Sequence, residues 1–384
     1  MSRARKIQSV ALGVIVVLLL GFFAAGWYYS GEIKDGGLVV KHEPDTFDLR
    51  VASIAGGRVT LETTPETSSN DRWNKEGLWG LASDNTYNRV SRIVDTTENT
   101  AIRDLVALGP LPSVGDPVRI DSFTFPGDPM QAHGIEFQEV GIPAALGTFP
   151  AWLTLGESDT WVILVHGKGA NRREALRLLP TLVDKWYSTL TITYRNGEGL
   201  PPSPSGYYQY GAEEWEDLEA AATFALAVGA KDLILVGFSM GGGIVTSFLY
   251  ESSVTSRVKG AILDSPALSL DASVDHGASQ RSFVGVPLPG ALTGLAKFLT
   301  TLRFGINFQD INYLNRVEEL STPILLFQGD DDPTVPVWLS DQFSDSLPDL
   351  VEYVRVSGAT HVGSWNVDPE RYEDAVRRFL AGLD

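Results

Sequence analysis

Three patterns of apolar and polar residues follow one another along the chain. Residues 7–29 form an uncharged stretch rich in Val, Leu, Gly and Phe. Over about 31–133, apolar residues alternate with polar ones in short runs bounded by Gly, Pro, Asn and Asp, which is typical of strands. Over about 134–384, short apolar runs alternate with amphipathic stretches, which indicates βαβ units on a mostly parallel sheet. The pattern predicts an apolar N-terminal helix, a small β-rich domain and a larger α/β domain.

The stretch 7–29 predicts a single transmembrane helix. A helix of this length rises about 34 Å, which is enough to cross a hydrocarbon core of about 30 Å. The basic residues that precede it are Arg3, Arg5 and Lys6. The sequence that follows it, Gly-Glu-Ile-Lys-Asp, leans acidic. This asymmetry places the N-terminus in the cytoplasm and the chain from about residue 31 outside it, with Trp27 at the outer interface.

A cleaved signal peptide is the alternative interpretation of the N-terminus. A basic start followed by an apolar run also describes such a peptide. The nearest approach to a small-residue cleavage site is Ala24-Ala25-Gly26, which bulky Trp27 follows. We therefore favour an uncleaved anchor in the cell membrane over secretion after cleavage. Under both interpretations the bulk of the chain is extracytoplasmic.

The stretch 31–133 predicts a small β-rich domain without a catalytic constellation. The alternating apolar residues are Phe47, Leu49 and Val51, then Val59 and Leu61, then Val118 and Ile120. The sequence leaves three roles open for this domain: packing on the main domain, holding it away from the membrane, or binding a partner.

The stretch 134–384 predicts the main domain. Buried strands are expected at 161–165, 189–194, 233–237, 258–263, 324–327 and 351–356, where apolar residues are nearly continuous. Helices are expected at 172–182, 213–228, 241–250, 337–344 and 369–381. Carboxylates crowd the start of the helix at 213–228, where the helix dipole tolerates negative charge. We interpret that acidic run as a solvated face and not as a metal site.

Composition and charge exclude several kinds of chemistry. The 384 residues carry a formal net charge of −18, which repels a phosphate backbone, so nucleic acid is a poor partner. The chain has no cysteine, which excludes disulfides, thiolate metal sites and a cysteine nucleophile.

A candidate nucleophile stands between a predicted strand and a predicted helix. The sequence Gly237-Phe238-Ser239-Met240-Gly241 has the layout of a nucleophile elbow, in which a serine occupies a sharp turn between small neighbours. A second motif, His166-Gly167-Lys168-Gly169, directly follows the strand at 161–165. There the backbone N–H groups of Lys168 and Met240 are candidates to stabilise an oxyanion.

A carboxylate and a histidine complete the candidate constellation. Asp330, Asp331 and Asp332 follow the strand at 324–327, and the spacing Gly-x-x-Asp-x-x-Val-Pro selects Asp332, with Asp264 as the reserve. A calcium loop is the alternative for the three aspartates, although no downstream Gly and Glu stand at EF-hand spacing. His361 follows the last strand, which is the chain position of a general base.

The order Ser239, Asp332, His361, preceded by the motif at 166–169, resembles the α/β-hydrolase superfamily over about 134–384. It is most similar to the serine-hydrolase branch with acylglycerol-lipase-like and prolyl-oligopeptidase-like members. The resemblance implies an α/β-hydrolase fold and an acyl-enzyme on Ser239, with His361 as the base and Asp332 holding it. No cofactor and no metal are implied. A membrane-anchored extracytoplasmic serine hydrolase of carboxylic esters, of esterase, lipase or thioesterase type, is the expected function.

A lid is expected at about 266–322, where this superfamily commonly inserts a cap. The apolar residues that recur at helical spacing within 291–304 are Leu292, Leu295, Phe298, Leu299 and Leu302. Such a face could line an acyl pocket or simply pack on the domain. Three tyrosines are further pocket candidates: Tyr207, Tyr208 and Tyr210.

Two alternatives to an esterase stay open. They are a serine peptidase of prolyl-oligopeptidase-like type and a catalytically silent binding protein on the hydrolase fold. The sequence names neither the acyl group nor the leaving group, and it leaves the oligomeric state undetermined.

Overall fold

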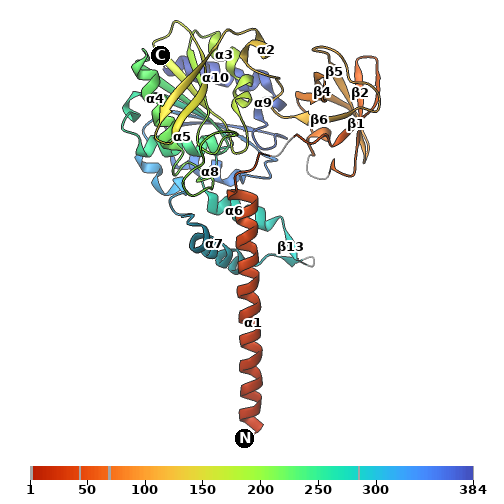
Figure 1. Ribbon diagram of the computed structural model, residues 1–384, viewed down its shortest axis with the longest axis vertical. Helices are drawn as coiled ribbons and strands as arrows, with labels where there is room; N and C mark the ends of the chain where they lie inside the picture. Colours follow the sequence, from red (N-terminus) through yellow and green to blue (C-terminus); the bar gives the residue numbers. More distant parts are fainter. Residues whose placement is uncertain (1–2, 43–44, 68–70, 284–285, 384) are drawn as a thin grey trace.

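The computed structural model describes residues 3–42, 45–67, 71–283 and 286–383. A long helix projects from a globular part in which helices pack on a large sheet, and a small barrel lies beside that part (Figure 1). The predicted α/β fold with a preceding apolar helix and a β-rich N-terminal region is confirmed. The domain boundaries at 31–133 and 134–384 stay a prediction.

The projecting helix is α1, Arg3–Ile33, which continues into a short π-helix, η1, Lys34–Leu38. Of the helices in the described part of the chain, it is the one long and apolar enough to cross a membrane by length and composition. From Ile7 to Ala24 its side chains are exposed on all sides, and Leu18 for example is 66% exposed. Burial begins at Gly26, so only the end of the helix packs on the globular part.

Strands β1 to β6 close into a barrel in the order β1-β2-β5-β4-β3-β6. Their bounds are β1 Leu49–Ala55, β2 Arg58–Thr63, β3 Trp79–Ala82, β4 Tyr87–Thr96, β5 Thr100–Val106 and β6 Pro117–Asp121. Alternation along β1 places Leu49 and Val51 inside the barrel and Arg50 outside it. The alternating residues that predicted strands lie in β1, β2 and β6, except Phe47, which precedes β1; β3 to β5 were not singled out individually.

The main sheet has the strand order β16-β15-β12-β11-β9-β10-β8-β7. Its strands are β7 Gln138–Ala144, β8 Gly147–Thr154, β9 Thr160–Val165, β10 Ser188–Ile192, β11 Asp232–Phe238, β12 Val258–Asp264, β15 Ile324–Gly329 and β16 Val351–Val356. Neighbours from β10 to β16 run parallel, whereas β8 pairs antiparallel with both β10 and β7. Every strand expected from a continuous apolar run is present. The β7–β8 pair was missed because its buried and exposed residues alternate too irregularly to stand out.

Two apolar layers enclose this sheet. Helices on both sides of the sheet contribute side chains to these layers. They are α3 Leu179–Val183, α4 Trp215–Ala227, α5 Met240–Glu251, α8 Val337–Ser346 and α10 Pro369–Leu383, with the short helices α2 Pro129–His133 and α9 Ser364–Val367. One layer contains Leu218 of α4, Phe248 of α5 and Phe343 of α8. The other contains Leu182 of α3 and Phe379 of α10. The sheet is therefore covered on both faces, as its nearly continuous apolar strands require.

The segment predicted as a lid contains α6 Leu270–Ser279, a small hairpin of β13 Ser282–Phe283 and β14 Val286–Pro287, and α7 Gly290–Phe304. These elements lie on the side of the globular part from which α1 projects (Figure 1). The apolar residues of α7 do not form one buried face. Leu292 and Leu299 are buried, whereas Phe298 and Leu302 are 59% and 66% exposed.

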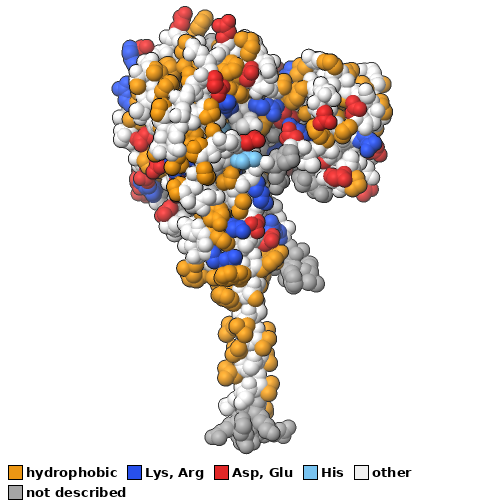
Figure 2. Space-filling model, viewed as in Figure 1, with side chains coloured by type: hydrophobic (Ala, Val, Ile, Leu, Met, Phe, Trp, Pro, Cys, Tyr) orange, Lys and Arg blue, Asp and Glu red, His pale blue; other side chains and the backbone are white. Residues whose placement is uncertain are grey.

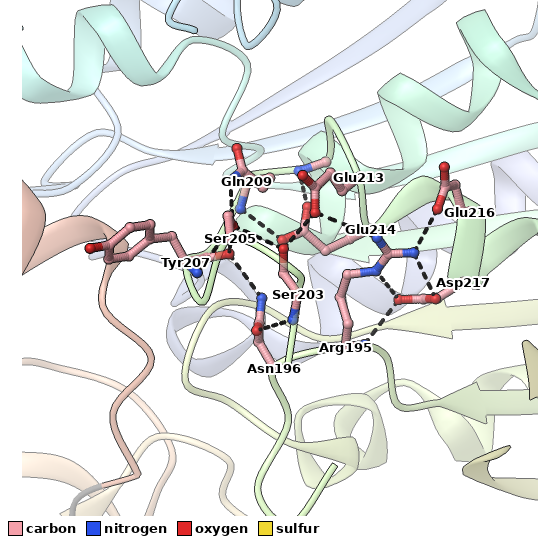
Figure 3. Close-up of polar contacts among 11 residues, drawn as sticks. Arg195, Asn196, Ser203, Ser205, Tyr207, Gln209, Glu213, Glu214, Glu216 and Asp217 are labelled. Atoms are coloured by element: carbon pink, nitrogen blue, oxygen red, sulfur yellow. Dashed lines mark hydrogen bonds and ion pairs between the residues drawn. The ribbon is translucent and has the colours of Figure 1, made fainter. Parts of the chain in front are cut away.

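The interpretation of the acidic run as a solvated face is wrong for two of its members. Asp217 is buried and pairs at 2.7 Å with the buried guanidinium of Arg195, which follows β10. Glu214 is fully buried and accepts the backbone N–H groups of Gln209 and Gly211 at 2.8 Å and 2.9 Å. Figure 3 shows this network bracing the loop between β10 and α4. Burial raises the pKa of Glu214.

Candidate active site

Ser239 occupies a strained turn between β11 and α5. Its backbone has φ 51° and ψ −116°, a combination that costs energy for any residue with a side chain. The turn is possible because its neighbours are small: a Cβ added at Gly241 would lie 2.2 Å from the carbonyl oxygen of Val165. The Ser239 N–H donates to the Asp264 carbonyl oxygen at 2.9 Å. The serine is thereby presented at the carboxyl edge of the sheet.

The structure brings Ser239, His361 and Asp332 together. The Nε2 atom of His361 lies 2.7 Å from Oγ of Ser239, and its Nδ1 atom lies 2.8 Å from Oδ2 of Asp332. The three residues come from the ends of β11, β16 and β15, which are distant in sequence and meet at one sheet edge. A hydroxyl, an imidazole and a carboxylate in this order can move a proton off the hydroxyl.

Asp332 is held as a carboxylate. Burial alone would raise its pKa, but the facing charge of His361 and its hydrogen bonds outweigh burial and lower the pKa. Its Oδ1 accepts the backbone N–H groups of Thr334 and Val335 at 2.8 Å and 2.9 Å. The side-chain amide of Gln328 donates to Oδ2 at 3.0 Å.

The other aspartates have different partners. Asp330 accepts the backbone N–H of Gly358 at 2.6 Å, and Asp331 pairs at 3.4 Å with Lys75 of the barrel region. The reserve residue, Asp264, makes no hydrogen bond to His361 within the described part of the chain; the Ser265 hydroxyl donates to it at 3.2 Å. Burial raises the pKa of Asp264 to about 6. Of the aspartates weighed from the sequence, Asp332 alone bonds to the imidazole.

The loop at 166–169 lies beside Ser239. Its residues Gly167, Lys168 and Gly169 line a cavity of about 210 Å³ together with Ser239 and His361. Burial lowers the pKa of His166 to about 4, and its neutral ring stacks on Tyr194 at 4.4 Å. The Tyr194 hydroxyl donates to the carbonyl oxygens of His166 and Gly167, which ties the carbonyl side of the loop to the core.

The sequence pattern of the alpha/beta hydrolase family matches residues 162–375, which is more than half of the chain. The chain belongs to the alpha/beta hydrolase family. Among solved structures, an esterase from Pyrococcus furiosus, Pf2001, superposes with a TM-score of 0.54 at 23% identity, over 68% of this chain and 98% of that one. Another crystal form of the same esterase gives a TM-score of 0.52 at 25% identity, over 65% and 91%.

Two buried residues that the sequence analysis missed support this hydrolase's site. Glu174 accepts the backbone N–H of Gly167 at 2.7 Å, and Arg177 donates to the carbonyl oxygen of Val362 at 2.8 Å. The two side chains lie 3.8 Å apart, so the pair joins the loop at 166–169 to the loop that carries His361. Their positions in a short helical segment carry no sequence signal, because a Glu and an Arg three residues apart are common on any exposed helix.

The barrel of this hydrolase forms one wall of the cavity beside Ser239. The barrel-side residues that line it are Arg72, Ser122 and Phe123. The contacts that hold the barrel in place include the pair of Arg173 with Asp121 and the hydrogen bond that the Asn366 side chain donates to the carbonyl oxygen of Leu78 at 2.9 Å. The barrel therefore packs on the main domain, which was one of the roles that the sequence left open.

Proposed function

We propose that this hydrolase cleaves carboxylic esters through an acyl-enzyme on Ser239. The observation that carries the proposal is the continuous contact from Ser239 through His361 to Asp332, at 2.7 Å and 2.8 Å. The likeness to a solved esterase, at 25% identity, supports an ester as the substrate.

In the first half of the reaction the Ser239 oxygen attacks the acyl carbon while His361 takes the hydroxyl proton. Asp332 stabilises the imidazolium that forms. The backbone N–H groups of Lys168 and Met240 donate to the oxyanion. The bond to the leaving alcohol then breaks, and His361 returns the proton to that oxygen.

In the second half, water attacks the acyl carbon on Ser239. His361 accepts a proton from the water and passes it to the serine oxygen as the ester bond breaks. The products are the acid and free Ser239. Every proton is moved by this chain's own residues.

We further propose that α1 is an uncleaved single-pass anchor and that the hydrolase domain is extracytoplasmic. Support comes from the exposed apolar surface of α1 and from the basic residues that precede it. Packing also supports it, because Gly26 is buried against Leu295 of α7, and cleavage after Gly26 would remove that contact.

Labelling with a fluorophosphonate probe tests the proposed nucleophile. The probe should label the full-length protein, and the Ser239→Ala variant should lose both labelling and ester hydrolysis. Ser346→Ala, which removes an exposed serine at the end of α8, is the matched control and should retain both. A folded wild-type protein that the probe does not label would favour a silent binding protein. A panel of p-nitrophenyl esters beside a peptide substrate separates an esterase from a peptidase.

Protease treatment of spheroplasts tests the topology. Added protease should degrade the hydrolase domain while a tag at the N-terminus survives in the membrane fraction. Protection of the whole chain would contradict the outward orientation. Loss of the tag from mature protein, with the domain released, would show cleavage instead.

A further inference from the structure

A second cavity lies between the end of α1, helix α6 and helix α7. Its volume is about 350 Å³, which is within the range of small-molecule pockets. The lining residues from the α1 end are Tyr29, Glu32, Ile33, Gly36 and Gly37. Opposite them lie Leu270 and Val274 of α6 and Leu292 and Ala296 of α7. The proposed anchor therefore supplies one wall of a pocket in the hydrolase.

This cavity adjoins the candidate active site. Lys168 lines both this cavity and the one that contains Ser239 and His361. Pro333 and Thr334, which directly follow Asp332, line it as well. An acyl group bonded to the Ser239 oxygen would therefore lie next to the second cavity, which the active-site cavity meets at Lys168.

The walls of the second cavity are mainly apolar, and its charged side chains are paired with other groups. Among its described lining residues, the charged ones are Glu32, Lys168 and Arg281. Glu32 and Arg281 lie 3.5 Å from one another, and Lys168 donates to the carbonyl oxygens of Gly36 and Gly37. The remaining walls offer mainly aliphatic and small residues, which suit a hydrocarbon chain.

Helix α7 packs on α1 where α1 would leave the membrane. A Cβ added at Gly26 would lie 2.6 Å from Cδ2 of Leu295, so glycine permits this close approach. The guanidinium of Arg303 lies 3.9 Å from the centre of the Trp27 ring and donates to the Trp27 carbonyl oxygen at 2.8 Å. Tryptophan at the end of an apolar span is typical of the membrane interface. Helix α7 therefore lies at the depth of that interface.

The outer face of α7 remains apolar and exposed. Phe298 and Leu302 are one helical turn apart and are mostly exposed, and Trp27 on α1 is 49% exposed although Arg303 covers one face of its ring. Figure 2 shows apolar side chains both on the projecting helix and on the underside of the globular part beside it. Such a surface is suited to contact with lipid.

We propose that the cavity between α1, α6 and α7 holds the acyl chain of a long-chain ester that resides in the membrane, and that this substrate enters from the bilayer surface. The inference rests on the proposed function, because the acyl carbon must reach Ser239. It adds a substrate class, an amphiphilic lipid ester, and gives α1 a role in binding as well as anchoring.

Filling the cavity tests the acyl assignment. Ala278 of α6 lines the cavity, and the next residue, Ser279, is exposed and does not. In full-length protein, Ala278→Trp should lower kcat/KM for p-nitrophenyl decanoate at least about ten-fold more than for the acetate, since only the decanoyl chain has CH₂ groups to bury in the cavity. Ser279→Trp, the matched control, should leave the ratio of the two values unchanged. An unchanged ratio in Ala278→Trp would overturn the assignment.

Supply from the bilayer is tested with phosphatidylcholine vesicles. Full-length protein is reconstituted either together with 4-methylumbelliferyl oleate or separately from vesicles that contain it. Hydrolysis should be at least about ten-fold faster when enzyme and ester share a bilayer. Equal rates would overturn entry from the membrane. If Ser239→Ala retained acetate hydrolysis, the proposed function itself would be wrong. If the wild-type protein hydrolysed acetate normally but showed no dependence on chain length or on shared vesicles, only this inference would be wrong.

Discussion

The ammonium nitrogen of Lys168 lies 3.2 Å from the carbonyl oxygen of Gly37. The same nitrogen is 3.2 Å from the carbonyl oxygen of Gly36, so Lys168 caps the end of the α1–η1 helix. The Tyr210 hydroxyl donates to Gly37 as well, at 2.9 Å, and Tyr210 belongs to the loop that the Arg195 network braces. The end of the apolar helix is thus joined directly to the loop that carries a candidate oxyanion donor.

Loss of this cap should affect turnover more than substrate binding. Burial lowers the pKa of Lys168, and its side chain makes its polar contacts with the helix end. Lys168→Met keeps the backbone N–H but releases the loop, so we expect kcat on a short-chain ester to fall about ten-fold with little change in KM. Steady-state kinetics measure this. Lys41→Met, at an exposed lysine nearby, is the control, and a pure KM effect would contradict a positioning role.

Replacing the carboxylate at 332 should nearly abolish hydrolysis. Asp332→Asn leaves a neutral amide beside His361, which cannot stabilise the imidazolium, so we expect kcat to fall by about three to four orders of magnitude. Asp331→Asn changes an exposed neighbour paired with Lys75 and should retain most activity. A similar loss in both variants would contradict the assignment of Asp332.

The acid side of the pH profile should report one ionisation. His361 must be unprotonated to accept the Ser239 proton, whereas the lowered pKa of Asp332 keeps that group ionised throughout the same range. Because Asp332 adds no second ionisation there, log kcat/KM for a non-ionising ester should fall on the acid side with a slope of no more than about one. A slope of two would mean that Asp332 takes up a proton in the same range. Activity regained at neutral pH after acid incubation controls for unfolding.

Asp264 should govern stability and not catalysis. Its pKa is raised from 3.8 to about 6, so the folded protein retains a proton that the unfolded chain loses between those values. Its contribution therefore falls as pH rises from about 4 to about 6, by up to about 3 kcal/mol. Asp264→Asn should remove this dependence, so that the variant gains stability relative to wild type over that range. Unfolding at a series of pH values measures it.

The same variant separates the two candidate carboxylates. Because Asp264 bonds to Ser265 and not to His361, Asp264→Asn should retain ester hydrolysis within about three-fold. Loss of activity equal to that of Asp332→Asn would reverse the assignment. A parallel pH dependence of stability in wild type and variant would show that Asp264 is ionised normally in the folded chain.

Local patterns were sufficient to predict much of the architecture. Each buried strand at the centre of the sheet is a continuous apolar run in the sequence, because both of its faces are covered. The turn at Ser239 needs glycines at neighbouring positions, and the chain order of Ser239, Asp332 and His361 follows the strand ends. These features depend on residues close together in the sequence, so the sequence contains their signal. The roles of these residues in catalysis stay predictions.

Other features depend on residues that only the fold makes neighbours. From the sequence alone, the acidic run resembles the solvated start of a helix. In the fold, Arg195, which follows a different strand, pairs with Asp217. Some apolar residues of α7 are buried against the domain and others are exposed, because α1 packs along that helix. The Glu174–Arg177 pair acquires its position only when the loops at Gly167 and Val362 meet.

The sequence by itself thus determined the fold class, the apolar helix and the set of groups available for chemistry. Tertiary structure decided which carboxylate faces the imidazole, which acidic side chains are buried and where the end of α1 meets the hydrolase domain. The physical reason is that burial and charge pairing depend on distances across the fold, whereas periodicity and turn chemistry depend on distances along the chain.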